Sequence, residues 1–201
     1  AASVFREVAI ALIYSAALVV ALALSATRIP MEVERRTVFN VASRDVRRWQ
    51  YVAGSWLGMF IVLGGVIALC TVATIAIGYF TMPGAEIMWR LLEAAFAVWL
   101  EVGVIMSLAV MLSCSFGVIT AVVGALAFTF VGHAVVTLLG LPEGVRAPWY
   151  FPSLDIFNVI NPVALGNGYG PMYALSMVLA FCAWVALLLL GGSVLFASRD
   201  L

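Results

Sequence analysis

Two ionisable residues, Glu101 and His133, lie inside otherwise apolar stretches of the sequence. An ionisable side chain in hydrocarbon is costly, so it marks a candidate functional site and is expected to have a polar partner. Counted inward from one membrane surface at roughly 1.5 Å per residue, the two residues lie within about 5 Å of each other in depth. Paired, they could relay protons or contact a polar substrate, because imidazole titrates near neutral pH. The alternative is a purely structural pair within a helix bundle.

Sulfur-containing side chains form the next candidate group. Met106, Met111 and Cys114 could together hold Cu(I), which prefers thioether and thiolate ligands. Their spacing does not keep to one helical face, and methionine is common in apolar interiors, so packing is the favoured interpretation. The other cysteines, Cys70 and Cys182, are isolated as well, which indicates free thiols and no metal site.

Catalytic motifs are missing from the sequence. It contains no Gly-x-Ser-x-Gly, no His-Glu-x-x-His and no pair of aspartates within an apolar stretch. All ten basic residues are arginine, so the chain also lacks the lysine of a phosphate-binding P-loop. We therefore predict a protein that is not an enzyme, has no cofactor of its own and does not hydrolyse ATP by itself.

The composition indicates what surrounds these residues. Hydrophobic residues make up 65% of the 201-residue chain and charged residues 10%, against roughly half and a quarter in soluble domains. Such a chain cannot build a water-exposed surface, so we predict an integral membrane protein and exclude a soluble enzyme. Ten arginines balance ten acidic residues, which gives no indication of a nucleic-acid partner.

Five apolar runs are long enough to cross roughly 30 Å of hydrocarbon as helices. The runs are continuous rather than alternating, which excludes the strands of a β-barrel and predicts an all-α bundle. Gly54 and Gly58, in the second run, form a Gly-x-x-x-Gly pair that would let another helix approach closely, although such pairs also arise by chance. The runs are Val8 to Ala26, Tyr51 to Phe80, Leu91 to Ser113, Phe116 to Gly140 and Tyr173 to Ala197.

Arginine placement predicts the orientation of these runs. Six arginines lie in the connection between the first two runs and Arg199 follows the last, whereas Arg6, Arg90 and Arg146 fall on the opposite side. The positive-inside rule therefore places this connection and the C-terminus in the cytoplasm. Five crossings then leave Ala1 outside, without a leader sequence to explain it. We expect a cytoplasmic segment and one further helix before Ala1 in the natural protein.

The connection, at about 28–50, is the most informative segment. Pro30 suits the first turn of a helix and acidic residues follow it, so a short helix is predicted from Pro30 to about Ala42. Ser43 and Asp45 could cap a second short turn before the next run. The segment is either a basic loop that contacts anionic lipid or a docking helix for a cytoplasmic partner, because acidic residues interleave with its arginines.

The segment at about 141–172 contains five prolines and several glycines, so it cannot form one long helix. Its aromatic residues are typical of a segment that lies at the membrane–water interface, here on the side opposite the cytoplasm. One or two helical turns are predicted between Ser153 and Ile160. The segment is either a capped connector or a substrate gate.

Two stretches resemble the permeases of ABC-2 type transporters, and most closely the branch associated with multicopper-enzyme maturation. Glu32-Val-Glu-Arg-Arg-Thr-Val-Phe, continued by Arg48-Trp-Gln-Tyr-Val-Ala-Gly-Ser-Trp-Leu-Gly58, resembles their cytoplasmic loop. Phe151-Pro-Ser-Leu-Asp-Ile-Phe-Asn resembles the Pro-Asn-Leu-x-x-Phe-Asn pattern before their last helix. In these permeases the loop forms a coupling helix in a groove of the ATPase subunit, and short re-entrant helices cap the outer side.

The resemblance implies roles for particular residues. Asp45-Val-Arg-Arg48 stands where the family usually has Pro-x-Ser-Arg, and Ser55 stands where it usually has lysine. These differences weaken the case for a copper-related substrate in this chain, and they are compatible with the coupling role. By position, the coupling residues are Glu32, Glu34, Arg35, Arg36, Thr37 and Arg48, and the outer-segment residues are Pro152, Leu154, Phe157 and Asn158.

The resemblance also implies a six-helix fold, of which this chain would be helices two to six in one transmembrane domain, 1–201. We expect an inner-membrane permease subunit that pairs with itself or a homologue and exports a substrate. ATP and Mg²⁺ would bind to a separate P-loop ATPase. Two alternatives stay open: a non-transporting assembly or anchor subunit, and a proton-coupled carrier built on Glu101 and His133. The absence of an internal inverted repeat disfavours the carrier.

Overall fold

The computed structural model describes residues 2–34, 48–81, 86–138, 154–158 and 168–197. These residues form five α-helices and one short 3-10 helix, with no strand among them, which confirms the predicted all-α class. The elements are α1 (Ala2–Glu34), α3 (Arg48–Thr81), α4 (Glu86–Ser113), α5 (Val118–Leu138), η1 (Asp155–Phe157) and α7 (Pro171–Ala197).

Four helices are long and apolar enough to span a membrane, and α5 carries a shorter apolar stretch. The chain is therefore a multi-pass membrane protein built as a helical bundle. Each of the five predicted runs coincides with one of the helices, while the crossing by α5 stays a prediction. The apolar stretches are Ser3–Arg28, Trp49–Phe80, Arg90–Ser113 and Pro171–Phe196, with Val118–Ala134 as the shorter one.

The predicted start of a new helix at Pro30 is wrong. α1 continues through Pro30 and ends at Glu34. A proline inside a helix removes one backbone hydrogen bond and crowds the carbonyl group four residues before it, at a cost of about 3 kcal/mol, but the helix can continue past it when the neighbouring peptide groups keep their bonds. The rest of the predicted helix and the turn at Ser43 and Asp45 lie outside the described residues.

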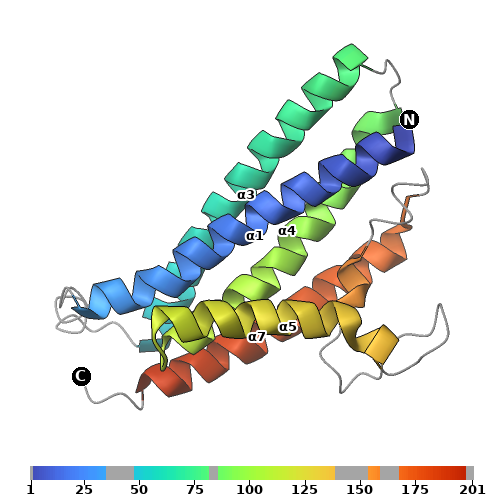
Figure 1. Cartoon of the computed structure of the whole chain (residues 1–201). Coiled ribbons are helices and arrows are strands. Elements are labelled where there is room, and N and C mark those ends of the chain that lie inside the picture. Colours follow the sequence, from blue (N-terminus) through green and yellow to red (C-terminus); the bar gives the residue numbers. More distant parts are fainter. Residues whose placement is uncertain (1, 35–47, 82–85, 139–153, 159–167, 198–201) are drawn as a thin grey trace.

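Consecutive helices run in alternating directions along the bundle (Figure 1). One end holds the last turn of α1, the first turn of α3, the turn between α4 and α5, and the last turn of α7 (Figure 1). The N-terminus, the start of α4 and the start of α7 lie at the opposite end (Figure 1). The helix ends that flank the arginine-rich connection therefore lie at the same end of the bundle as the end of α7, in the relative arrangement that the arginine pattern predicts.

Helix α4 is the centre of the bundle. It packs against each of the other four α-helices and against η1. Of its apolar stretch 78% is buried, against 39% for α1, 22% for α3 and 17% for α7. Small residues make this close approach possible, because alanine, glycine and valine let neighbouring backbones come near. The buried small residues include Ala94, Ala97, Val98, Val102, Val104 and Ala109.

An aromatic stack joins α3, α4 and α7. The ring of Phe60 stacks on Trp56 at a centroid distance of 4.9 Å, on Trp99 at 4.5 Å and on Phe181 at 5.3 Å. Trp99 Nε1 also donates a hydrogen bond to the Phe60 carbonyl oxygen, at 3.3 Å. Gly103 lies under the stack, where a Cβ would be 2.6 Å from Phe60 and 2.9 Å from Phe181. The stack thus depends on a residue without a side chain.

The Gly54 and Gly58 pair contacts no other part of the described chain, because nothing lies within 4 Å of a Cβ built at either position. The close helix approach that the pair would permit is therefore not made by any of the described residues. An approach by another helix stays a prediction.

Replacing Gly103 with alanine is expected to destabilise the protein. Overpacking a filled interior costs about 1–3 kcal/mol, which exceeds the gain of about 1 kcal/mol from the better helix propensity of alanine. The measurement is the melting temperature of the purified protein in detergent. The control is Gly65→Ala, because a Cβ at Gly65 meets nothing within 4 Å; this variant should melt at or above the temperature of the native chain. Equal melting temperatures for the two variants would contradict the packing argument.

Candidate functional site

The ionisable residues inside the bundle meet in one cluster, which we call the Glu101 cluster and define as Tyr14, Glu101 and His133. The Tyr14 hydroxyl donates to Glu101 Oε1 at 3.0 Å. His133 Nε2 lies 2.7 Å from the same oxygen and 3.4 Å from the Tyr14 hydroxyl. The predicted pairing of Glu101 with His133 is confirmed, and the cluster joins α1, α4 and α5.

Glu101 is the most buried member of the cluster, with only 3% of its surface exposed. A carboxylate so far from water needs donors from the protein, because an unpaired charge in a low-dielectric interior is strongly unfavourable. An ionised Glu101 accepts hydrogen bonds from both Tyr14 and His133. The His133 side chain is 35% exposed, so it lies between the buried carboxylate and the bundle surface. The cluster therefore has one enclosed side and one accessible side.

A cavity of about 340 Å³ adjoins the cluster. Its walls come from α1, α4, α5 and the segment that contains η1, so residues far apart in sequence close it together. Phe157 and Asn158 belong to that segment, and Phe157 is almost fully buried. The lining residues are Ile10, Tyr14, Val98, Glu101, His133, Phe157 and Asn158.

The segment 154–158 is fastened to the bundle at specific points. The Leu154 backbone N–H donates to the Gly132 carbonyl oxygen at 3.1 Å. The Leu154 side chain occupies the space in front of Gly132, where a Cβ would lie 2.8 Å from Leu154 Cγ. Tyr173, in α7, donates its hydroxyl to the Ile156 carbonyl oxygen at 2.8 Å. We call residues 154–158 the cap, because two of them form a wall of the cavity.

Residues 168–170 are tied to the first turns of α4. Tyr169 donates its hydroxyl to the Glu93 carbonyl oxygen at 2.7 Å. Burial, followed by the charge of Glu93, raises the pKa of Tyr169 to about 12, so this donor stays protonated at neutral pH. Arg90 and Glu93 form an ion pair at 3.0 Å. Both flanks of the 159–167 stretch are thus attached to the bundle.

Asp155 brings another carboxyl group near the cluster. Burial raises the pKa of Asp155, and the neighbouring His133 lowers it in part. Asp155 Oδ2 is buried, and no hydrogen-bond partner for it is found among the described residues. The cap therefore contributes a partly desolvated acidic group beside the imidazole of His133.

The residues assigned by resemblance fall into two groups. Leu154, Phe157 and Asn158 lie in the cap, and η1 confirms the predicted helical turn between 153 and 160, whereas Pro152 lies outside the described residues. The backbones of Glu32 and Glu34 form the last turn of α1, and Arg48 begins α3. The predicted coupling residues Arg35, Arg36 and Thr37 lie outside the described part of the chain. Their role stays a prediction.

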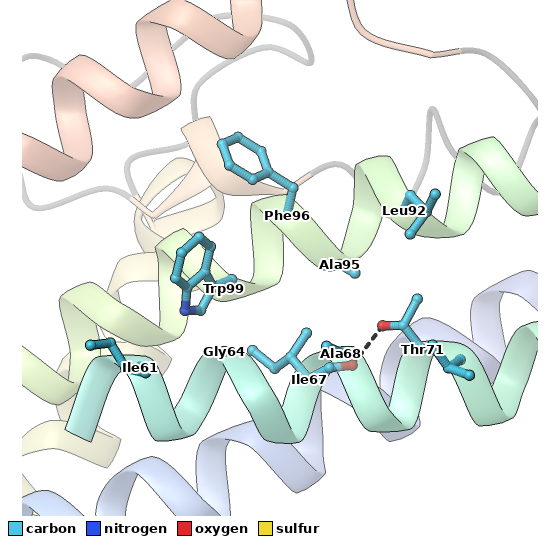
Figure 2. A pocket seen from close by; sticks show the side chains of 10 residues that line it. Ile61, Gly64, Ile67, Ala68, Thr71, Leu92, Ala95, Phe96 and Trp99 are labelled. Carbon is cyan, nitrogen blue, oxygen red and sulfur yellow. Dashed lines mark hydrogen bonds between the residues drawn. The ribbon is translucent and has the colours of Figure 1, made fainter. Parts of the chain in front are cut away.

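A second cavity, of about 480 Å³, is a groove between α3 and α4 (Figure 2). Its few polar groups are already bonded: the Thr71 hydroxyl donates to the Ile67 carbonyl oxygen at 2.7 Å (Figure 2), and Trp99 donates to Phe60. The groove therefore offers an apolar surface without a free donor.

The sulfur-containing residues pack in the interior: Met106 and Cys114 are fully buried. Within the described residues, no group of three His, Cys, Asp or Glu side chains is placed to hold a metal ion.

Tyr14 is the member of the cluster that the sequence analysis missed. It lies in the first apolar run, where aromatic residues usually pack or anchor a helix at the membrane interface. A usable signal does exist, because a tyrosine hydroxyl well inside a membrane-spanning run must find a partner within the protein. Its partner could not be chosen from the sequence without knowing that α1 packs on α4.

The fold and the Glu101 cluster define a multi-pass helical membrane protein with a buried polar site. No known protein-family model and no curated protein sequence matches this chain.

Replacing Tyr14 with phenylalanine is expected to lower the stability of the folded protein by roughly 0.5–2 kcal/mol, because Glu101 loses a donor that water cannot replace. The measurement is thermal unfolding in detergent. Tyr79→Phe is the matched control, because Tyr79 is 68% exposed and its hydroxyl is not part of the cluster. A destabilisation no larger in Tyr14→Phe than in Tyr79→Phe would show that the Tyr14 hydroxyl is not needed.

Proposed function

We propose that this protein is the permease subunit of an ABC-2 type transporter, driven by a separate ATPase. The observation that carries the proposal is the sequence of the connection that joins α1 to α3 and its resemblance to a coupling helix. The arrangement of the helices supports it, because α1 ends and α3 begins at the same end of the bundle as the end of α7 (Figure 1). The positive-inside rule makes that end cytoplasmic, where an ATPase would bind.

A displacement of the connection would reach the interior through two helices. α1 contacts α4 through Tyr14 and Glu101, and α3 contacts α4 through Phe60 and Trp99. Transport requires that the ATPase bind the connection differently in its two nucleotide states. Packed helices would then carry the displacement toward the Glu101 cluster and the cap. Two permease copies, or one copy and a homologue, would form the translocation unit.

The test is co-purification from mild detergent, with mass spectrometry of the bound proteins and an ATPase assay. The double variant Glu34→Arg, Arg36→Glu is expected to lose a stoichiometric P-loop ATPase, because it reverses two charges of the coupling surface. The control is Glu7→Arg, which reverses an exposed charge near the opposite end of α1 and should keep the ATPase bound. Native protein that purifies without any ATPase would overturn the transporter proposal and favour the assembly or anchor role.

The short contact between Glu101 and His133 favours a second candidate function, a proton-coupled carrier. Glu101→Gln should then abolish proton flux into proteoliposomes under an imposed pH gradient, because the amide cannot exchange a proton at this site. Glu93→Gln is the matched control, since Glu93 pairs with Arg90 away from the cavity, and it should leave the flux unchanged. Flux that survives Glu101→Gln would eliminate the carrier.

A further inference from the structure

The cavity beside the Glu101 cluster combines a polar side and an apolar side. Glu101, Tyr14, His133 and Asn158 bring polar groups to its walls, and the other lining residues are Ile10, Val98 and Phe157. A volume of about 340 Å³ lies within the range of roughly 300–1,000 Å³ that small-molecule sites occupy. A ligand that fits these walls has one polar group and a small apolar body.

The charges around the cavity select the sign of that polar group. Glu101 and Asp155 carry two negative charges when ionised, and His133, which interacts with both of them, supplies at most one positive charge. Arg90 and Glu93 pair with each other and do not line the cavity. With both carboxyls ionised, these three groups hold more negative than positive charge in a partly desolvated setting, where a cation is the ligand that compensates it.

We propose that this cavity binds a small organic ammonium ion. Its charged nitrogen would lie near the Glu101 carboxylate and against the rings of Tyr14 and Phe157, whose π faces attract cations. Its apolar body would fill the space beside Ile10 and Val98. As a statement about the transported substrate, this inference rests on the proposed function; as a statement about binding, it concerns this chain alone.

A groove adjoins the cavity on the α1–α5 side. This groove, of about 620 Å³, is lined by Tyr14, Leu126, Thr129, Phe130, His133 and Ala134. Tyr14 and His133 line both the groove and the cavity, so they form the wall between the two spaces. A cation with an apolar body could enter this groove from the membrane, where a hydrated inorganic ion could not. Rotation of the His133 ring would then join the two spaces.

The test measures thermal unfolding of the purified chain in detergent at constant ionic strength. The probes are choline and n-butylammonium, compared with the uncharged alcohols of similar shape, 3,3-dimethyl-1-butanol and 1-butanol respectively. At ten times the dissociation constant, at least one ammonium probe should raise the melting temperature by roughly 3–6 °C. Neither alcohol should do so. Equal shifts from an ammonium ion and its alcohol, no shift from either ammonium ion, or an equal shift from sodium chloride would each overturn the proposal.

Variants then locate the site. Glu101→Gln should remove the ammonium-induced shift, and Phe157→Leu should raise the ligand concentration needed for half of the shift by about three- to tenfold, since it removes an aromatic face. Phe157→Leu keeps the test decisive if Glu101→Gln does not fold. Glu93→Gln should leave the shift unchanged, and a shift that survives the change at Phe157 would place the ligand elsewhere. Failure to recover an ATPase would leave these results unaffected, so the two proposals fail separately.

Discussion

The burial of one carboxylate constrains the arrangement of this bundle. Glu101 can lie at the centre only if donors reach it from other helices, and Tyr14 and His133 supply them from α1 and α5. Two helices that are distant in sequence must therefore sit on the same side of α4, at matching depth. Apolar contacts in a membrane discriminate weakly between helix pairings, because lipid tails are as apolar as the side chains they replace. The polar cluster gives these three helices a defined register.

The cap follows from the same constraint. A polar cluster that was open at the end of the bundle would admit water freely, whereas Leu154 and Phe157 are nearly fully buried there. The cap is held by the backbone bond to Gly132 and by the Tyr173 hydroxyl, so it depends on both α5 and α7. This arrangement leaves a cavity that is enclosed at the end of the bundle and adjoins a groove along its side. Tyr14 and His133, which are both partly exposed, separate this groove from the cavity beside Glu101.

Much of the fold could be predicted from the sequence, because continuous apolar runs fix helix number and position with little ambiguity. The Glu101–His133 pair was predictable for a similar reason: a charge within such a run needs a partner, and few are available. Three features could not be predicted from the sequence. Tyr14 looks like any interfacial aromatic until α1 is packed on α4. Pro30 favours the start of a helix by its backbone chemistry, and its place inside α1 goes against that preference. The central place of α4 depends on which apolar faces meet, and hydrophobicity alone does not distinguish them.

The two helices that flank the arginine-rich connection are held to α4 by different kinds of contact. Separating α1 from α4 would remove the Tyr14 hydroxyl from Glu101 and leave a buried carboxylate with one donor fewer. The free energy would therefore rise steeply as soon as the two helices move far enough apart to break this hydrogen bond. Moving α3 would slide Phe60 across Trp99 and Phe181 and lengthen the hydrogen bond from Trp99 to the Phe60 carbonyl oxygen, and offset stacking changes gradually with displacement. Much of the outward face of α3 is exposed and would not resist such a movement. The contact between α3 and α4 therefore yields more gradually than the contact between α1 and α4, and the polar cluster ties α1 to both α4 and α5.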